Sequence, residues 1–98
     1  MPVELLKDQA EWALVLGGVV DIFDVATLHA VALEAATGAP SGVVARLGGV
    51  ESIDTAVSQV LLGLKRALAV DARTLTLDGA PASVLEFWRR AGLGEELA

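Results

Sequence analysis

The spacing of apolar residues changes repeatedly along this chain, and each change coincides with glycine or proline. In residues 11–17 the bulky side chains of Trp12, Leu14 and Leu16 alternate with smaller ones, which is the two-residue period of a strand. From Thr55 the apolar residues recur every three or four positions, which is the period of a helix with one buried face. A chain that switches between these periods predicts an α/β fold.

The breaks delimit strand-like and helix-like segments in the order β-β-α-β-α-β-α. Strands are expected at Val3 to Leu6, Glu11 to Gly17, Val43 to Leu47 and Thr74 to Asp78, and helices at Asp24 to Gly38, Thr55 to Val70 and Pro81 to Gly92. This order predicts a mixed, largely parallel sheet of about four strands with helices mainly on one face. The glycine pairs at residues 17–18 and 48–49 lack the spacing of phosphate-binding loops and are interpreted as tight strand exits.

Periodicity also predicts the core and the helix caps. Asp24 and Asp54 stand immediately before helical patterns, where a carboxylate can accept a free backbone N–H of the first turn. In the last helix Val84, Leu85 and Trp88 are expected to face the sheet. The predicted core contains Trp12, Leu14, Leu16, Leu61, Leu64, Leu75, Leu77 and Trp88.

The helix from Thr55 to Val70 carries the most regular apolar stripe. Rotation by about 100° per residue places Val57, Leu61, Leu64 and Leu68 on the inner side and Thr55, Ser58, Gln59, Leu62 and Arg66 on the outer side. An exposed Leu62 among polar neighbours would suit a transient protein interface. Thr55, in the first turn, also occupies a position that favours an added phosphate, although a simple capping role fits it as well.

Composition excludes several classes of protein. With 98 residues the chain is expected to form a single domain over residues 1–98. A net charge of −6 disfavours nucleic-acid binding, and the lack of cysteine removes disulfides and thiolate chemistry. The acidic start is unlike a signal peptide, and no apolar run is long enough to span a bilayer, so we expect a cytoplasmic protein.

Catalytic and metal-binding patterns are missing from the sequence. The one histidine, His29, lies within a helical pattern without a second ligand and is interpreted as a solvated or edge residue. No nucleophile, base and orienting group are spaced as a set, which argues against a small hydrolase. We therefore expect no enzymatic activity, no cofactor and no metal.

Three segments resemble the STAS domain, the domain of bacterial anti-sigma-factor antagonists and of sulfate-transporter tails. They are the turn GVVD at residues 18–21, the stretch VVARLGGVESIDTA at residues 43–56 and the closing AGL at residues 91–93. The resemblance covers about residues 3–93 and implies a STAS-like fold.

The resemblance also implies a function. STAS domains generally act as non-enzymatic switches that bind a partner, often an ATP-binding anti-sigma kinase, through the face around the start of the second helix. Here Ala56 stands at the usual phosphoacceptor position, Val57 at a usual glycine and Arg46 at a usual strand aspartate. Thr55 and Ser58 are thus the candidate phosphorylation sites. The expected partner-binding residues are Asp21, Asp54, Thr55, Ala56, Ser58, Gln59, Leu62 and Arg66.

Two other branches of the family share the Asp-Thr-small sequence found at residues 54–56. One contains STAS proteins encoded beside chemotaxis-type signalling components. The other is the small subunit of bacterial lipid-asymmetry ABC transporters, in which a similar threonine seats on the ATPase. The implied partner is therefore an anti-sigma factor or histidine-kinase-like ATPase, a chemotaxis-type signalling protein or, in the alternative role of accessory subunit, an ABC-transporter ATPase.

Overall fold

The computed structural model describes residues 2–9 and 11–97. Its elements are β1 (Val3–Lys7), β2 (Trp12–Val20), the 3-10 turn η1 (Ile22–Asp24), α1 (Val25–Gly38), β3 (Val43–Ile53), α2 (Thr55–Val70), β4 (Leu75–Asp78), α3 (Ala82–Arg90) and α4 (Gly94–Leu97). The predicted order β-β-α-β-α-β-α is confirmed. The structure adds η1 and α4, both too short to carry an apolar period.

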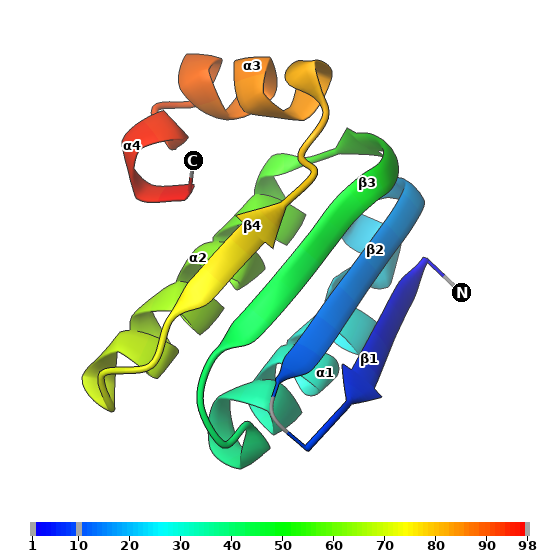
Figure 1. Ribbon diagram of the computed structural model, residues 1–98. Helices are drawn as coiled ribbons and strands as arrows, with labels where there is room; N and C mark the ends of the chain where they lie inside the picture. Colours follow the sequence, from blue (N-terminus) through cyan, green and yellow to red (C-terminus); the bar gives the residue numbers. More distant parts are fainter. Residues whose placement is uncertain (1, 10, 98) are drawn as a thin grey trace.

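The strands form one mixed sheet in the order β1-β2-β3-β4. β1 is antiparallel to β2, whereas β2, β3 and β4 are mutually parallel. Figure 1 shows α1 and α2 side by side behind the sheet, which leaves its front face without a helical layer. The predicted arrangement, with helices mainly on one face, is confirmed.

β2 and β3 are longer than predicted because both continue through their glycine pairs. Gly17 pairs with Gly49, and register shifts flank this region. Gly18 has a φ of 69°, a conformation that glycine adopts without a clash at Cβ. The ladder ends only where Val20 stands opposite Ile53, so the interpretation of the glycine pairs as strand exits is wrong.

The core lies between the sheet and the two covering helices. Most of the predicted members are buried: Leu14, Leu16, Leu61, Leu64, Leu75 and Trp88. Trp12 and Leu77 are only partly buried and pack against this core, since Trp12 begins its strand and Leu77 lies on the edge strand β4. The Trp12 ring also explains Gly38 at the end of α1, because a Cβ at that position would lie 2.6 Å from it.

α2 is buried along two stripes, not one. The inner stripe is confirmed by the burial of Val57, Leu61, Leu64 and Leu68. The expectation that Ser58 and Leu62 face outward is wrong: their exposed fractions are 0% and 4%. Trp88 of α3 contacts Ser58, and α4 packs on α2, so the C-terminal helices cover this second stripe. Leu85, expected to face the sheet, is instead 41% exposed.

No helix in residues 2–9 and 11–97 is long and apolar enough to cross a membrane.

Truncation of the inner stripe should be strongly destabilising. Leu64 is 3% exposed, so Leu64→Ala is expected to lower the free energy of unfolding by about 2–5 kcal/mol through lost burial and a residual cavity. Urea denaturation measures the change. The matched variant Leu33→Ala removes the same atoms from a side chain that is 59% exposed and should change stability by less than about 0.5 kcal/mol. Equal effects of the two variants would contradict the assignment of the core.

Candidate functional site

Two loops meet at the carboxyl edge of the parallel strands β2 and β3. Val20 and Ile53 are the last paired residues, so Asp21 and Asp54, which follow them, begin neighbouring connections into η1 and α2. In Figure 1 this edge lies at the top of the sheet, where β3 curves into α2. In parallel α/β sheets the carboxyl edge is where loops are free to present binding groups.

Asp54 caps α2, as predicted. Its Oδ1 accepts a hydrogen bond of 2.9 Å from the backbone N–H of Val57. The carboxylate also lies near the positive end of the helix dipole. Thr55 follows in the first turn and is exposed, while Ala56 is partly buried. The cap therefore fixes the backbone that presents the Thr55 hydroxyl to solvent.

Asp24 stands at the N-cap position of α1, as predicted, but the side-chain capping bonds are made one turn earlier, around η1. Asp21 Oδ1 accepts from the N–H of Phe23 at 3.0 Å, and Asp24 Oδ2 accepts from the N–H of Asp21 at 3.0 Å. This reciprocal pair is a capping box around η1. The Asp24 side chain makes no capping bond to α1.

Ser58 belongs to a buried hydrogen-bond chain. Its hydroxyl donates to the carbonyl oxygen of Asp54 at 2.8 Å and accepts from the indole Nε1–H of Trp88 at 2.8 Å. Both hydrogen-bonding functions of the hydroxyl are thus used inside the protein. A kinase or a partner could reach Ser58 only if α3 moved away, which removes it from the surface on which it was expected.

Three exposed apolar side chains at this edge were missed by the sequence analysis. Phe23 is 89% exposed, Ile22 65% and Val19 55%, and η1, which holds two of them, contacts α2. We call Ile22, Phe23, Thr55 and Gln59 the carboxyl-edge surface. Val19 faces the helix-free side of the sheet instead, because the next residue, Val20, is buried under the helices. The available signal was the apolar pair at residues 22–23, in a turn where polar residues are usual.

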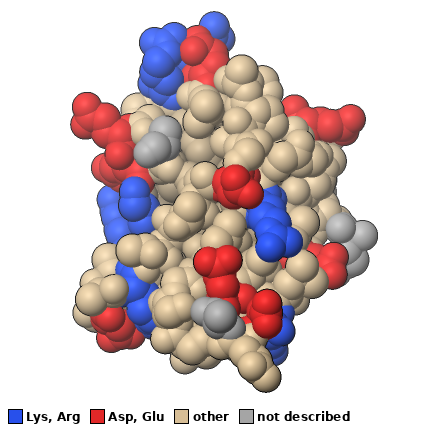
Figure 2. Space-filling view, in the orientation of Figure 1, with Lys and Arg blue, Asp and Glu red and all other residues tan. Residues whose placement is uncertain are grey.

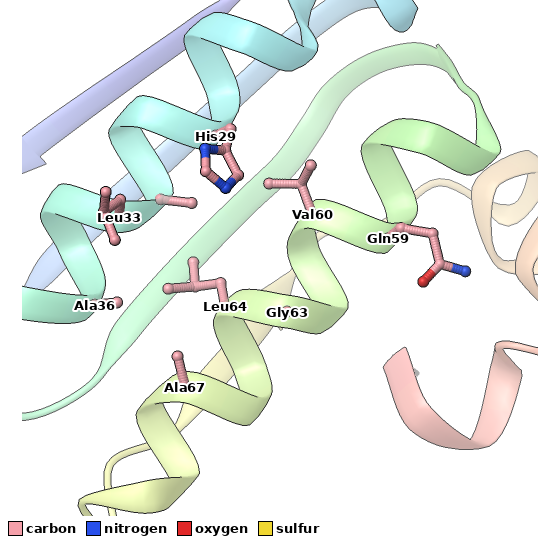
Figure 3. A pocket seen from close by; sticks show the side chains of 9 residues that line it. His29, Leu33, Ala36, Gln59, Val60, Gly63, Leu64 and Ala67 are labelled. Carbon is pink, nitrogen blue, oxygen red and sulfur yellow. The ribbon is translucent and has the colours of Figure 1, made fainter.

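The remaining residues of α2 that were expected to bind a partner do not lie together. Gln59 is exposed one turn beyond Thr55, and Figure 3 shows its side chain directed away from α1. Arg66 is exposed as expected, but it lies about 16 Å further along the helix axis than Thr55. It pairs with Glu96 at 3.1 Å and thereby helps to hold α4. Arg66 therefore does not join the carboxyl-edge surface.

A shallow groove separates α1 from α2 (Figure 3). It has a volume of about 380 Å³ and is lined mainly by apolar or small residues, with His29 and Gln59 as its polar members. His29 is exposed, in agreement with its interpretation as a solvated residue. In the described part of the chain no three His, Asp or Glu side chains are grouped to hold a metal ion.

Charges are dispersed over the surface. Figure 2, which views the face without helices, shows basic and acidic groups interspersed over it, several of them side by side. On α3 the carboxylate of Glu86 accepts hydrogen bonds from Arg89 and Arg90, and the Arg89 bond above all lowers the pKa of Glu86. This cluster is exposed and far in sequence from the carboxyl-edge surface.

Comparison with protein families decides the identity. A family model described as "Mlab, STAS domain" matches residues 4–98. The chain belongs to the STAS domain family. A comparison with curated protein sequences finds no match.

Solved structures show the same fold for this STAS domain. The anti-sigma factor antagonist SpoIIAA in its unphosphorylated form is similar with a TM-score of 0.80 and 18% identity, over 98% of this chain and 85% of that one. The phosphorylated form of SpoIIAA from Bacillus has a TM-score of 0.71 and 23% identity, over 98% of this chain and 88% of that one. A serine-to-glutamate variant of RsbS from Moorella thermoacetica has a TM-score of 0.78 and 23% identity, over 95% of this chain and 80% of that one. The domain thus resembles anti-sigma-factor antagonists in fold.

The Ser58–Trp88 bond should contribute to the stability of this STAS domain. Ser58→Ala leaves the buried indole N–H without an acceptor, which is expected to lower the free energy of unfolding by about 1–3 kcal/mol. Trp88→Phe should also destabilise. The double variant should lose less free energy of unfolding than the two single variants lose together, because the bond that they share is removed only once. Urea denaturation of all four proteins measures the coupling, with the exposed Ser83→Ala as control. Strictly additive losses would refute the bond.

Proposed function

We propose that this STAS domain is a non-enzymatic signalling module that binds a protein partner through the carboxyl-edge surface. The observation that carries the proposal is the exposure of Phe23 and Ile22 on η1, which contacts α2, the helix that presents Thr55 and Gln59. An apolar centre with a polar surround is the usual composition of a protein interface. Large side chains in such a centre supply most of the binding free energy.

The polar groups at this surface are better suited to holding the backbone than to catalysis. The carboxylates of Asp21, Asp24 and Asp54 each accept a backbone N–H, and the Ser58 hydroxyl is occupied by Trp88. Thr55 is the exposed hydroxyl in the first turn of α2. Because these three carboxylates are engaged in caps, they are poorly placed to activate it as a nucleophile. The arrangement therefore favours binding over chemistry.

The fold suggests the class of partner. SpoIIAA is an anti-sigma factor antagonist with phosphorylated and unphosphorylated forms. By analogy, the first candidate partner of this domain is an anti-sigma factor or a related kinase-like ATPase in the cytoplasm, followed by a chemotaxis-type signalling protein. Asp21, Asp54, Thr55, Ala56 and Gln59 would lie at or beside the contact.

A second role is favoured by the family model itself, whose description names Mlab. In that role the domain is an accessory subunit of a lipid-asymmetry ABC transporter and binds its ATPase. The same surface would serve, with Thr55 seated on the ATPase. Titration with a purified ATPase of each kind separates the two roles.

Removal of the apolar anchor should abolish binding without unfolding the domain. Phe23 is 89% exposed, so Phe23→Asp is expected to leave the melting temperature within a few degrees and to weaken partner affinity roughly tenfold or more. Calorimetric titration with the cognate ATPase measures the affinity. Leu33→Asp, an exposed apolar position on α1, is the matched control and should bind like the parent. Unchanged affinity of Phe23→Asp would place the interface elsewhere.

Phosphorylation, if it regulates this surface, should occur on Thr55. Incubation with a cognate kinase followed by mass spectrometry is expected to find phosphate on Thr55 and none on the buried Ser58. Thr55→Glu should weaken partner binding, because it places a charge at the rim of an apolar contact, whereas Thr55→Val should bind and resist modification. Stoichiometric phosphate on Ser83 or Thr37 would exclude the start of α2 as the switch.

A further inference from the structure

The outer edge of β4 carries backbone groups that the sheet does not use. β4 is the last strand in the order β1-β2-β3-β4 formed by the described residues. The N–H of Val43 donates to the carbonyl of Thr74, and Val43 is paired with Leu75 in parallel register. Alternate residues of a strand bond to opposite sides, so Thr76 and Asp78 bond to β3. The N–H and C=O groups of Leu75 and Leu77 therefore point away from the sheet.

A hollow of about 460 Å³ lies beside this edge. Its walls come from four elements and include Lys65 of α2, Leu75 and Leu77 of β4, Leu85 and Trp88 of α3 and Leu97 of α4. In Figure 1 β4 lies at the margin of the sheet, with α3 and α4 near its carboxyl end. Trp88 and Leu97 are buried, so the exposed apolar part of these walls includes Leu77 and Leu85, which an apolar side chain could cover favourably.

The free edge of β4 and the hollow beside it are together complementary to an extended peptide. An added strand supplies N–H and C=O groups at the spacing of a free strand edge, and its alternate side chains point to one side. A helix could not do this, because its backbone groups bond to each other. β4 also lacks the lysine and proline by which sheet edges are commonly protected. The net charge of −6 disfavours an acidic peptide.

We propose that the outer edge of β4 is a second docking site, which takes a short extended segment of a partner protein and places one aliphatic side chain of that segment in the hollow. The four residues of β4 limit the added strand to a short peptide and a weak, reversible contact. This site is separate from the carboxyl-edge surface and does not depend on the function proposed for it.

Selection of random heptapeptides displayed on phage tests the proposal with the full chain. Selected peptides should carry aliphatic residues at alternate positions. In the free protein the amides of Leu75 and Leu77 should exchange with solvent faster than those of Thr76 and Asp78, and a saturating peptide should slow them. N-methylation of one alternate set of peptide amides should abolish binding, and methylation of the other set should not.

Two protein variants complete the test. Leu85→Asp puts a charge into the hollow at a position that is 41% exposed and should weaken peptide binding at least tenfold. Val70→Asp, at a position that is 84% exposed outside the hollow, and Phe23→Asp should both bind like the parent. The proposal is overturned if no peptide is selected, if Leu85→Asp binds as well as the parent, or if neither methylation pattern matters. Loss of peptide binding in Phe23→Asp would assign the peptides to the carboxyl-edge surface instead.

Discussion

The parallel pairing of β2 with β3 beyond their glycine pairs determines both where the core ends and where the carboxyl-edge surface begins. If the strands stopped at the glycines, the loops that follow would leave the sheet separately. Instead the ladder runs to Val20 and Ile53, and the two loops emerge side by side. The ladder continues through two register shifts, at each of which β3 has one residue more than β2. Gly18 lies between the two shifts and has a positive φ, which glycine adopts readily. The exposed Phe23 and the start of α2 become neighbours as a consequence.

The C-terminal helices depend on α2 more than on the sheet. Trp88 is fully buried and donates to Ser58, while Lys65 and Arg66 of α2 bond to the backbone and the side chain of Glu96. These contacts cover a side of α2 that would otherwise expose Leu62. A satisfied buried hydrogen bond of this kind specifies one arrangement of the packed elements, because any shift leaves the indole N–H unpaired. Ser58 in turn donates to the carbonyl oxygen of Asp54, so the two bonds together link α3 to the residue that caps α2.

The order of strands and helices could be predicted because each long element repeats its apolar period several times. What the period could not show was the second partner of α2: Ser58 is polar, and a single apolar Leu62 on a helix is equally compatible with solvent. α4 is too short for any period. The exposed Ile22 and Phe23 were missed for the opposite reason, since the sequence marks them as apolar without saying whether the core has room for them. Thr55 was placed correctly on the surface, because the capping residue Asp54 before it marks the start of the helix.

Charge and apolar contact act differently at the start of α2. A phosphate on Thr55 would add roughly two negative charges beside Asp54, whose carboxylate already holds the N–H of Val57. The helix dipole attracts the phosphate, but Asp54 repels it and competes for the same N–H groups. Ile22 and Phe23 meet no such opposition, since their burial is favourable against any apolar partner surface. In the proposed interface affinity would therefore come from apolar packing, and a phosphate on Thr55 would weaken it by placing at its rim a charge that resists desolvation.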